Sequence, residues 1–185
     1  MVLNSKIFFD MNFKFGLILF VSLITLSFGL HKDLNKKIDK EIRTTYNVET
    51  YSYNVITISQ EVVKELTAKF DNNNLLKIHT KDELLGYAYI GKAPSKTDEF
   101  DYLILFDKDL IIMKSKILIY REDYGGEIGS KRWLKQFIGK TLTDELVYGD
   151  NIAAISGATI SVKSMTLAIN KLLQSIKILH NKNII

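Results

Sequence analysis

The stretch Ile155-Ser156-Gly157-Ala158-Thr159-Ile160-Ser161 stands directly before a long amphipathic run near the end of the 185-residue chain. In that run, apolar residues recur at helical spacing, at Met165, Ala168, Ile169, Leu172, Leu173, Ile176 and Leu179. The spacing predicts a helix that begins at or just after Thr159 and buries one face. The first amides of a helix lack internal partners, and the helix dipole is positive there. The small residues before Thr159 would let a phosphate or phosphate ester approach that backbone.

The same residues also have an ordinary structural interpretation. Serine and threonine are common N-cap residues, and glycine often precedes a helix. On this chemistry alone, helix capping is favoured over a phosphate site.

The segments upstream read as alternating short elements. The patterns predict a helix over Thr57–Phe70, strands over Leu75–Thr80, Glu83–Lys92, Asp98–Asp107 and Leu110–Arg121, and a helix that holds Trp133, Gln136 and Phe137. Hairpin-like strands followed by helices argue for an α+β fold, with a mostly antiparallel sheet and flanking helices. We expect a single domain over residues 57–180.

The string Ser156-Gly157-Ala158-Thr159, followed by one residue and Ser161, resembles the attachment motif of the FMN-binding domain family. That family includes the flavin-carrying subunits C of sodium-translocating NADH:quinone reductase and G of the Rnf complex. Gly86-Tyr87, the loop over residues 121–129 and Gln136-Phe137 are similar to further family features. The resemblance covers residues 84–175, about half of the chain.

This resemblance implies FMN as the cofactor and Thr159 as the residue that carries it through a phosphoester bond. In the family, a separate magnesium-dependent flavin transferase moves FMN from FAD onto the threonine. Thr159 would therefore be an acceptor and anchor, and we predict no catalytic residue. The other predicted cofactor-binding residues are Ser156, Gly157, Ala158 and Ser161 beside the phosphate, and Glu122, Gly125 and Gly126 in the loop. Trp133 is either a ring-stacking residue or part of the core.

The sequence departs from the family pattern at Ala153, three residues before Ser156. The family usually has an acidic residue there, which belongs to the pattern that the transferase reads; Asp150 is the nearest acid. We therefore expect FMN either covalently bound to Thr159 or bound non-covalently in the same pocket.

An apolar run over residues 15–30 follows Lys14 near the N-terminus. The run is short for a membrane span. Its basic start and the small-x-small residues Ser27-Phe28-Gly29 fit an export signal cut after Gly29, and an uncleaved anchor is the alternative. We expect residues 1–29 to be this signal or anchor and residues 30–56 to be a spacer with an exposed charged helix. The expected location is extracytoplasmic, in the periplasm or on the outer face of the inner membrane, with membrane association possible through residues 1–29.

Composition excludes several kinds of site. The chain has no cysteine, which removes disulfides and Cys-ligated iron–sulfur clusters. Its formal net charge of +4 comes without a basic stripe, so we expect no nucleic-acid partner. His31, His79 and His180 are far apart in the sequence and form no metal-binding pattern, so no metal site is predicted.

Together, these patterns predict an exported FMN-binding protein that transfers electrons, as a carrier domain or as a subunit of an oxidoreductase complex. The expected partners are the flavin transferase and a membrane electron-transfer complex or another redox protein. Two alternatives remain open. One is a non-covalent flavin reductase, although the sequence has no clear acid–base set. The other is a redox-silent envelope binding or scaffold protein.

Overall fold

The computed structural model describes residues 33–71 and 73–185, so the expected signal or anchor at residues 1–29 lies outside the described residues. The chain divides into two compact units, and the second comprises residues 40–185. The described part of the first unit, residues 33–39, is helical, with Lys36 Nζ 3.9 Å from Asp33 Oδ1. No helix within the described ranges has both the length and the apolarity that a membrane crossing requires.

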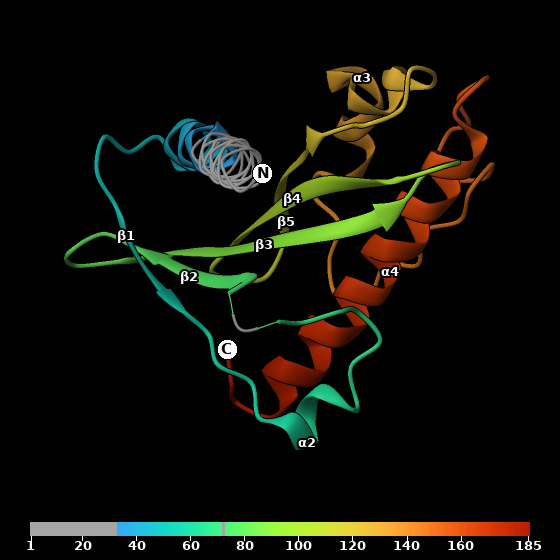
Figure 1. Ribbon diagram of the computed structural model, residues 1–185. Helices are drawn as coiled ribbons and strands as arrows, with labels where there is room; N and C mark the ends of the chain where they lie inside the picture. The colour runs from blue at the N-terminus through green and yellow to red at the C-terminus, as the bar shows by residue number, and fades with distance from the viewer. Residues whose placement is uncertain (1–32, 72) are drawn as a thin grey trace, which may run out of the picture. The chain divides into compact units, whose positions relative to one another are not determined.

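A five-stranded antiparallel sheet forms the frame of the second unit, and its strands lie in chain order (Figure 1). The strands are β1 (Ser52–Val55), β2 (Leu75–His79), β3 (Leu84–Pro94), β4 (Glu99–Asp107) and β5 (Ile112–Ile119). The longest pairing joins β3 to β4, from Gly86 opposite Asp107 to Pro94 opposite Glu99. The predicted α+β fold with a mostly antiparallel sheet is confirmed, and four predicted strands correspond to β2–β5.

The C-terminal helix α4 (Thr159–Asn181) packs across one face of this sheet (Figure 1). Alternate residues of β4, namely Tyr102, Ile104 and Phe106, join a hydrophobic core with the apolar stripe of α4. Burial of this stripe stabilises the long helix, because the hydrophobic effect grows with the apolar area removed from water. The predicted start of the helix at Thr159 is confirmed.

Residues 40–56 belong to the compact unit, although they were expected within a spacer. Ile42 is buried, and the Glu41 carboxylate lies 3.3 Å from Lys116 Nζ and 3.5 Å from Lys114 Nζ on β5. This part of the charged helix is therefore held against the sheet by ion pairs. The charge pattern of residues 32–43 is that of an exposed helix, and it gives no sign of these long-range partners.

The Tyr46 side chain packs over Gly86 of β3. Its hydroxyl donates a hydrogen bond to the Phe106 carbonyl oxygen at 2.6 Å and lies 3.3 Å from the Tyr87 carbonyl oxygen. Burial raises the pKa of Tyr46, so the hydroxyl remains protonated as a donor. Gly86, at φ +152°, leaves the space that this side chain occupies, since a Cβ atom there would lie 2.9 Å from the tyrosine oxygen.

The predicted helix over Thr57–Phe70 is wrong except for one turn. Only α2 (Gln60–Val63) is α-helical. The amides of Thr67 and Ala68 instead donate to Ser175 Oγ on α4, at 3.0 and 2.9 Å. These hydrogen bonds to a distant residue replace the ones that would have continued the helix, and sequence periodicity does not reveal them.

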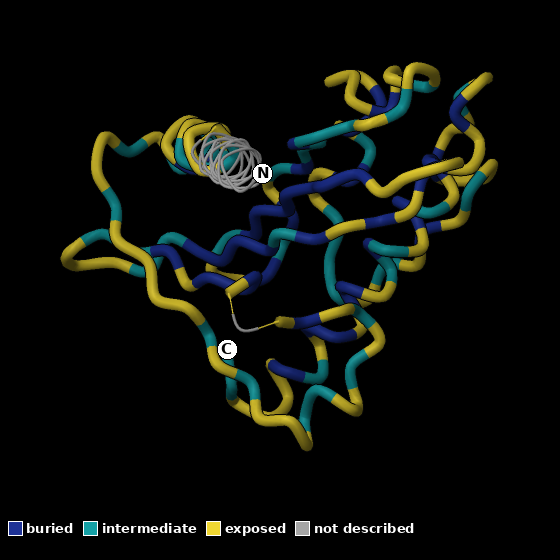
Figure 2. Tube along the Cα trace, in the orientation of Figure 1, coloured by how far each residue is buried: buried dark blue, intermediate teal, exposed yellow. Residues whose placement is uncertain are grey.

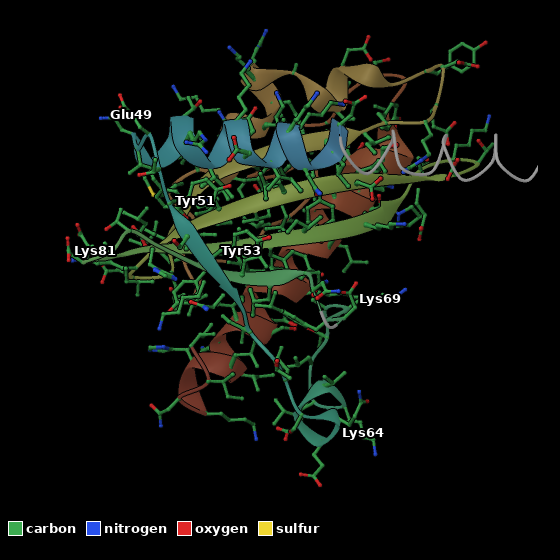
Figure 3. All side chains as sticks on the ribbon, turned by 60° about the vertical axis from the view of Figure 1, so that its left-hand side comes forward. Glu49, Tyr51, Tyr53, Lys64, Lys69 and Lys81 are labelled. Atoms are coloured by element: carbon green, nitrogen blue, oxygen red, sulfur yellow. The ribbon has the colours of Figure 1, made fainter. Side chains whose placement is uncertain are left out.

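β1 forms one edge of the sheet, and all four of its residues are exposed (Figure 2). Tyr53, labelled in Figure 3, is 56% exposed on this strand. The inner strands β3 and β4 are buried over most of their length (Figure 2). An edge strand this short offers little length for pairing with another chain.

Candidate functional site

The first turn of α4 has no side-chain cap. Its N-cap residue is Ala158, which has no side-chain acceptor, and it follows Gly157 at φ +81°. The capping interpretation of the serine and threonine residues is therefore wrong. The amide donors at the start of α4 stay available to a ligand, and the helix dipole favours a negatively charged one.

The residues around this helix start differ in accessibility. Ser156, Gly157 and Thr159 are exposed, so the threonine hydroxyl is open to solvent. Ser161 is only 3% exposed, and its hydroxyl shares a hydrogen bond with that of Tyr120, with 3.0 Å between the oxygens. Ser161, predicted beside a phosphate, thus ties the first turn of α4 to the residue that follows β5.

The glycine-rich loop over residues 121–129 contacts the start of α4. A Cβ atom at Gly125 would stand 3.1 Å from the Ala158 Cβ and 3.0 Å from the Tyr120 hydroxyl oxygen. Gly125 also has φ +76°, which favours glycine. A Cβ atom at Gly126, in contrast, would meet nothing within 4 Å. The structure therefore brings together Gly125 and Ala158, which are 33 positions apart in the chain, and it leaves open space at the neighbouring Gly126.

Glu122 belongs to the loop after β5, and its side chain contacts the turn between β3 and β4. Its carboxylate accepts hydrogen bonds from the amides of Thr97 at 2.6 Å and Asp98 at 3.2 Å. Hydrogen bonding to the carboxylate, from the Thr97 amide first and the Ser95 side chain next, lowers the pKa of Glu122 from the usual 4.5 to about 2. The same turn is joined to α4, because Ser164 Oγ donates to the Pro94 carbonyl oxygen. Glu122 thus holds the β3–β4 turn, which in turn contacts the first turns of α4. Its contact with a flavin stays a prediction.

Replacement of Glu122 by glutamine should flatten the acid side of the stability profile. Between about pH 4.5 and 2 the unfolded chain binds more protons at Glu122 than the folded protein does. The ionised carboxylate therefore adds stability that is complete above about pH 4.5 and is lost as the pH falls towards 2. Solvent screening keeps the effect small, because the group is exposed.

Urea unfolding of the parent and of Glu122→Gln, at a series of pH values down to the acid limit, measures this difference. Glu127→Gln, in the same loop, is the matched control for loss of one negative charge. An identical pH dependence in the parent and Glu122→Gln would contradict the stabilising role assigned to the hydrogen bonds of this carboxylate.

Two side chains, those of Trp133 and Gln136, bind the backbone of Ala153, three residues before Ser156; we call this pair of hydrogen bonds the clamp. Trp133 Nε1 donates to the Ala153 carbonyl oxygen at 2.8 Å, and the Ala153 amide donates to Gln136 Oε1 at 2.7 Å. The predicted helix that holds both side chains consists of α3 (Lys131–Leu134) and the 3-10 turn η2 (Lys135–Phe137). Sequence reasoning missed this clamp; its only signal is the three-residue spacing that places Trp133 and Gln136 on one side of a helix.

Trp133 is a core residue. It is 5% exposed, and its ring meets that of Phe137 edge-on at a centroid distance of 5.1 Å. Its indole N–H is also occupied by Ala153. Of the two interpretations drawn from the sequence, the structure supports packing over ring stacking.

A positive charge lies one turn into α4. Lys163 follows Thr159 by four residues, so the two share a face of the helix. The Lys163 ammonium lies 5.0 Å from the centre of the Tyr148 ring, a cation–π contact that restricts where the charge lies. Sequence reasoning passed over this residue, although its spacing from Thr159 was visible.

These observations fit a cofactor that ends in a phosphate. Uncapped amides and a nearby ammonium suit an anionic group, the Thr159 hydroxyl is accessible, and the open space at Gly126 adjoins them. Residues 96–174 match the family model described as FMN-binding domain, which confirms the resemblance seen in the sequence. The match includes the loop, the clamp and Thr159. A search of curated proteins gives no significant match to the chain.

Proposed function

Because the chain carries an FMN-binding domain over residues 96–174 and FMN is its cofactor, we propose that it is an exported electron-transfer protein with FMN linked to Thr159. The observation that carries this proposal is the exposed Thr159 hydroxyl at the uncapped start of α4, against the glycine-rich loop. An acceptor for a modifying enzyme has to be reachable, and this hydroxyl is.

Attachment needs a second enzyme. A threonine hydroxyl is a weak nucleophile without an adjacent base, and in the described ranges no hydrogen bond reaches the Thr159 hydroxyl. A flavin transferase would supply FAD and the base. A bond forms between Thr159 Oγ1 and the phosphorus on the FMN side, and the bond from that phosphorus to the bridging oxygen breaks. AMP leaves with that oxygen, and the hydroxyl proton passes to the transferase.

The backbone around the acceptor supports the proposal in spite of Ala153. The clamp from Trp133 and Gln136 binds the amide and carbonyl groups of Ala153, which do not depend on the side chain at that position. The segment that leads to Thr159 therefore keeps a defined conformation without the acidic residue of the family pattern. This favours a preformed acceptor site for FMN over a site that has lost its ability to accept FMN.

The residues of the chain would bind and orient the cofactor. Amides in the first turn of α4, with Ser156, Gly157 and Ala158, would hold the phosphate, and Gly125 and Gly126 give the rest of the molecule room to approach the loop. When bound, FMN supplies the one- and two-electron chemistry. The chain itself contributes binding and position.

The N-terminal sequence supports a location outside the cytoplasm. The basic start and the apolar run over residues 15–30 are typical of an export signal, or of an anchor that keeps the domain at the membrane. The natural partner is then a membrane electron-transfer complex or another redox protein that exchanges electrons with the flavin.

Expression of the full chain with a flavin transferase tests the proposal. We expect yellow protein, flavin fluorescence in a denaturing gel, and a mass gain equal to FMN minus one water. Yellow native protein without a fluorescent band would overturn the covalent link and favour the reductase alternative, which is then assayed as NADH oxidation without a partner. Colourless protein would overturn the electron-carrier role and favour the scaffold.

A further inference from the structure

Tyr124 is unusually exposed for an aromatic residue. Its exposed fraction is 81%, whereas Tyr120 in the same segment is half-buried. A single exposed tyrosine is ordinary by itself. The position of Tyr124 makes it a candidate ligand-binding residue, because the next residue, Gly125, contacts Ala158 at the start of α4.

The contact at Gly125 limits the distance between Tyr124 and the attachment residue. Tyr124 precedes Gly125, and Thr159 follows Ala158, so each is one peptide unit from the contact. With the 3.2 Å from a Gly125 Cβ to the Ala158 Cα and ordinary backbone lengths, the Cα atoms of Tyr124 and Thr159 lie at most about 12 Å apart. A ring joined to Thr159 through a phosphate and a five-carbon ribityl chain can reach a side chain at that range.

The other aromatic residues near the start of α4 are engaged. Trp133 is buried with its N–H on Ala153, and Tyr148 lies under the Lys163 ammonium. Tyr120 bonds Ser161, and its ring packs against that of Phe100 at 5.9 Å. Within the described part of the chain, this leaves Tyr124 as the aromatic side chain at the site with no ring or hydrogen-bond partner.

An exposed aliphatic side chain faces solvent on the helix side of the same contact. Ile160, directly after Thr159, is 50% exposed at the first turn of α4. Exposed side chains thus occur on both segments that meet at the Gly125–Ala158 contact, Tyr124 on the loop and Ile160 on the helix. Such side chains suit a flat, largely apolar ring, because aromatic rings gain from stacking and from removal of apolar area from water.

We propose that Tyr124 stacks on the isoalloxazine ring of the FMN attached to Thr159, with Ile160 as an apolar support. The inference rests on the proposed function. Gly125 and Gly126 follow Tyr124 and carry no side chain that would stand between the phenol and the ring. A tyrosine stacked on a flavin quenches its fluorescence, so emission per bound flavin reports this contact independently of electron-transfer activity.

The experiment uses the flavinylated full chain. For each variant, flavin emission is measured in the native protein and again after denaturation, and the ratio of the two normalises for flavin content. We expect a low ratio in the parent, a several-fold higher ratio in Tyr124→Ala, and a low ratio in Tyr124→Trp, which retains a stacking and quenching ring. Tyr53→Ala, an exposed tyrosine on the opposite edge strand β1, should match the parent.

The outcomes separate this inference from the proposed function. Emission after denaturation shows whether flavin is bound, so a parent chain without flavin refutes both. Bound flavin with equal ratios in the parent and Tyr124→Ala overturns the stacking role alone. A Tyr124→Trp ratio as high as that of Tyr124→Ala would also overturn it, because the ring at this position would then have no contact with the flavin.

Discussion

Replacement of Thr159 by alanine should abolish covalent FMN while leaving the protein folded. Thr159 is exposed at the first position of α4, and alanine is a good helix former there. The free energy of unfolding should change by no more than about 0.5 kcal/mol, as for most surface substitutions. After co-expression with the transferase, the fluorescent band in a denaturing gel should disappear completely, because no phosphoester can form without the hydroxyl.

Thr159→Ser is the matched control, since it restores a hydroxyl at the same position and should restore a fluorescent band. The neighbouring serines are the competing acceptors. Ser156 is exposed, whereas Ser161 is buried and bound to Tyr120, so Ser156 is the more accessible of the two. A band that persists in Thr159→Ala and vanishes in Ser156→Ala would move the attachment site to Ser156.

Replacement of Gly86 by alanine should be the most destabilising change among the glycines. A Cβ atom at this position would overlap the Phe106 carbonyl oxygen in the adjacent strand and crowd the Tyr46 hydroxyl. The backbone also adopts φ +152°, which disfavours a side chain. Relief of the overlap would move β3 away from β4 and disturb the hydrogen bond from Tyr46 to Phe106. We expect a loss of about 3 kcal/mol in the free energy of unfolding, or failure to fold.

Urea unfolding of the purified full chain measures this loss. Gly129→Ala is the matched control, because a Cβ atom there meets nothing within 4 Å, and its stability should stay close to that of the parent. Tyr46→Phe separates the two contributions: it removes the hydroxyl and should cost about 1 kcal/mol, as a typical hydrogen bond does. A Gly86→Ala variant as stable as Gly129→Ala would contradict the close approach described at this glycine.

The parts of the fold predicted from sequence are those whose pattern is local. The apolar run from Tyr102 to Phe106, whose successive residues lie on opposite faces of a strand, predicted β4, and the apolar stripe predicted α4 from its first residue. The misassigned parts depend on distant partners. Periodicity over Thr57–Phe70 is compatible with a helix, but Ser175 takes the amides that a longer helix would have used.

The long-range contacts of the N-terminal part of the compact unit could not be predicted for the same reason. Charges around Glu41 indicate a solvated helix, yet Lys114 and Lys116, more than 70 residues away, bind that carboxylate. At the candidate site, the resemblance pointed to Thr159 and the glycine-rich loop, and the structure brings Gly125 of that loop against Ala158, the residue before Thr159. The alanine N-cap and the clamp on Ala153 could not be predicted, because backbone hydrogen bonding leaves little trace in residue types.

The segment that matches the family model is shorter than the segment that forms the folded unit, because the match leaves out β3, the partner of β4. The family match begins at residue 96, after the last residue of β3. A polypeptide cut at that boundary would lose the strand opposite β4 from Gly86 to Pro94 and would present a bare, hydrophobic strand edge to other copies. A fragment chosen by the family match would therefore be prone to aggregation. Cooperative unfolding, in contrast, should involve the chain from residue 40 onward.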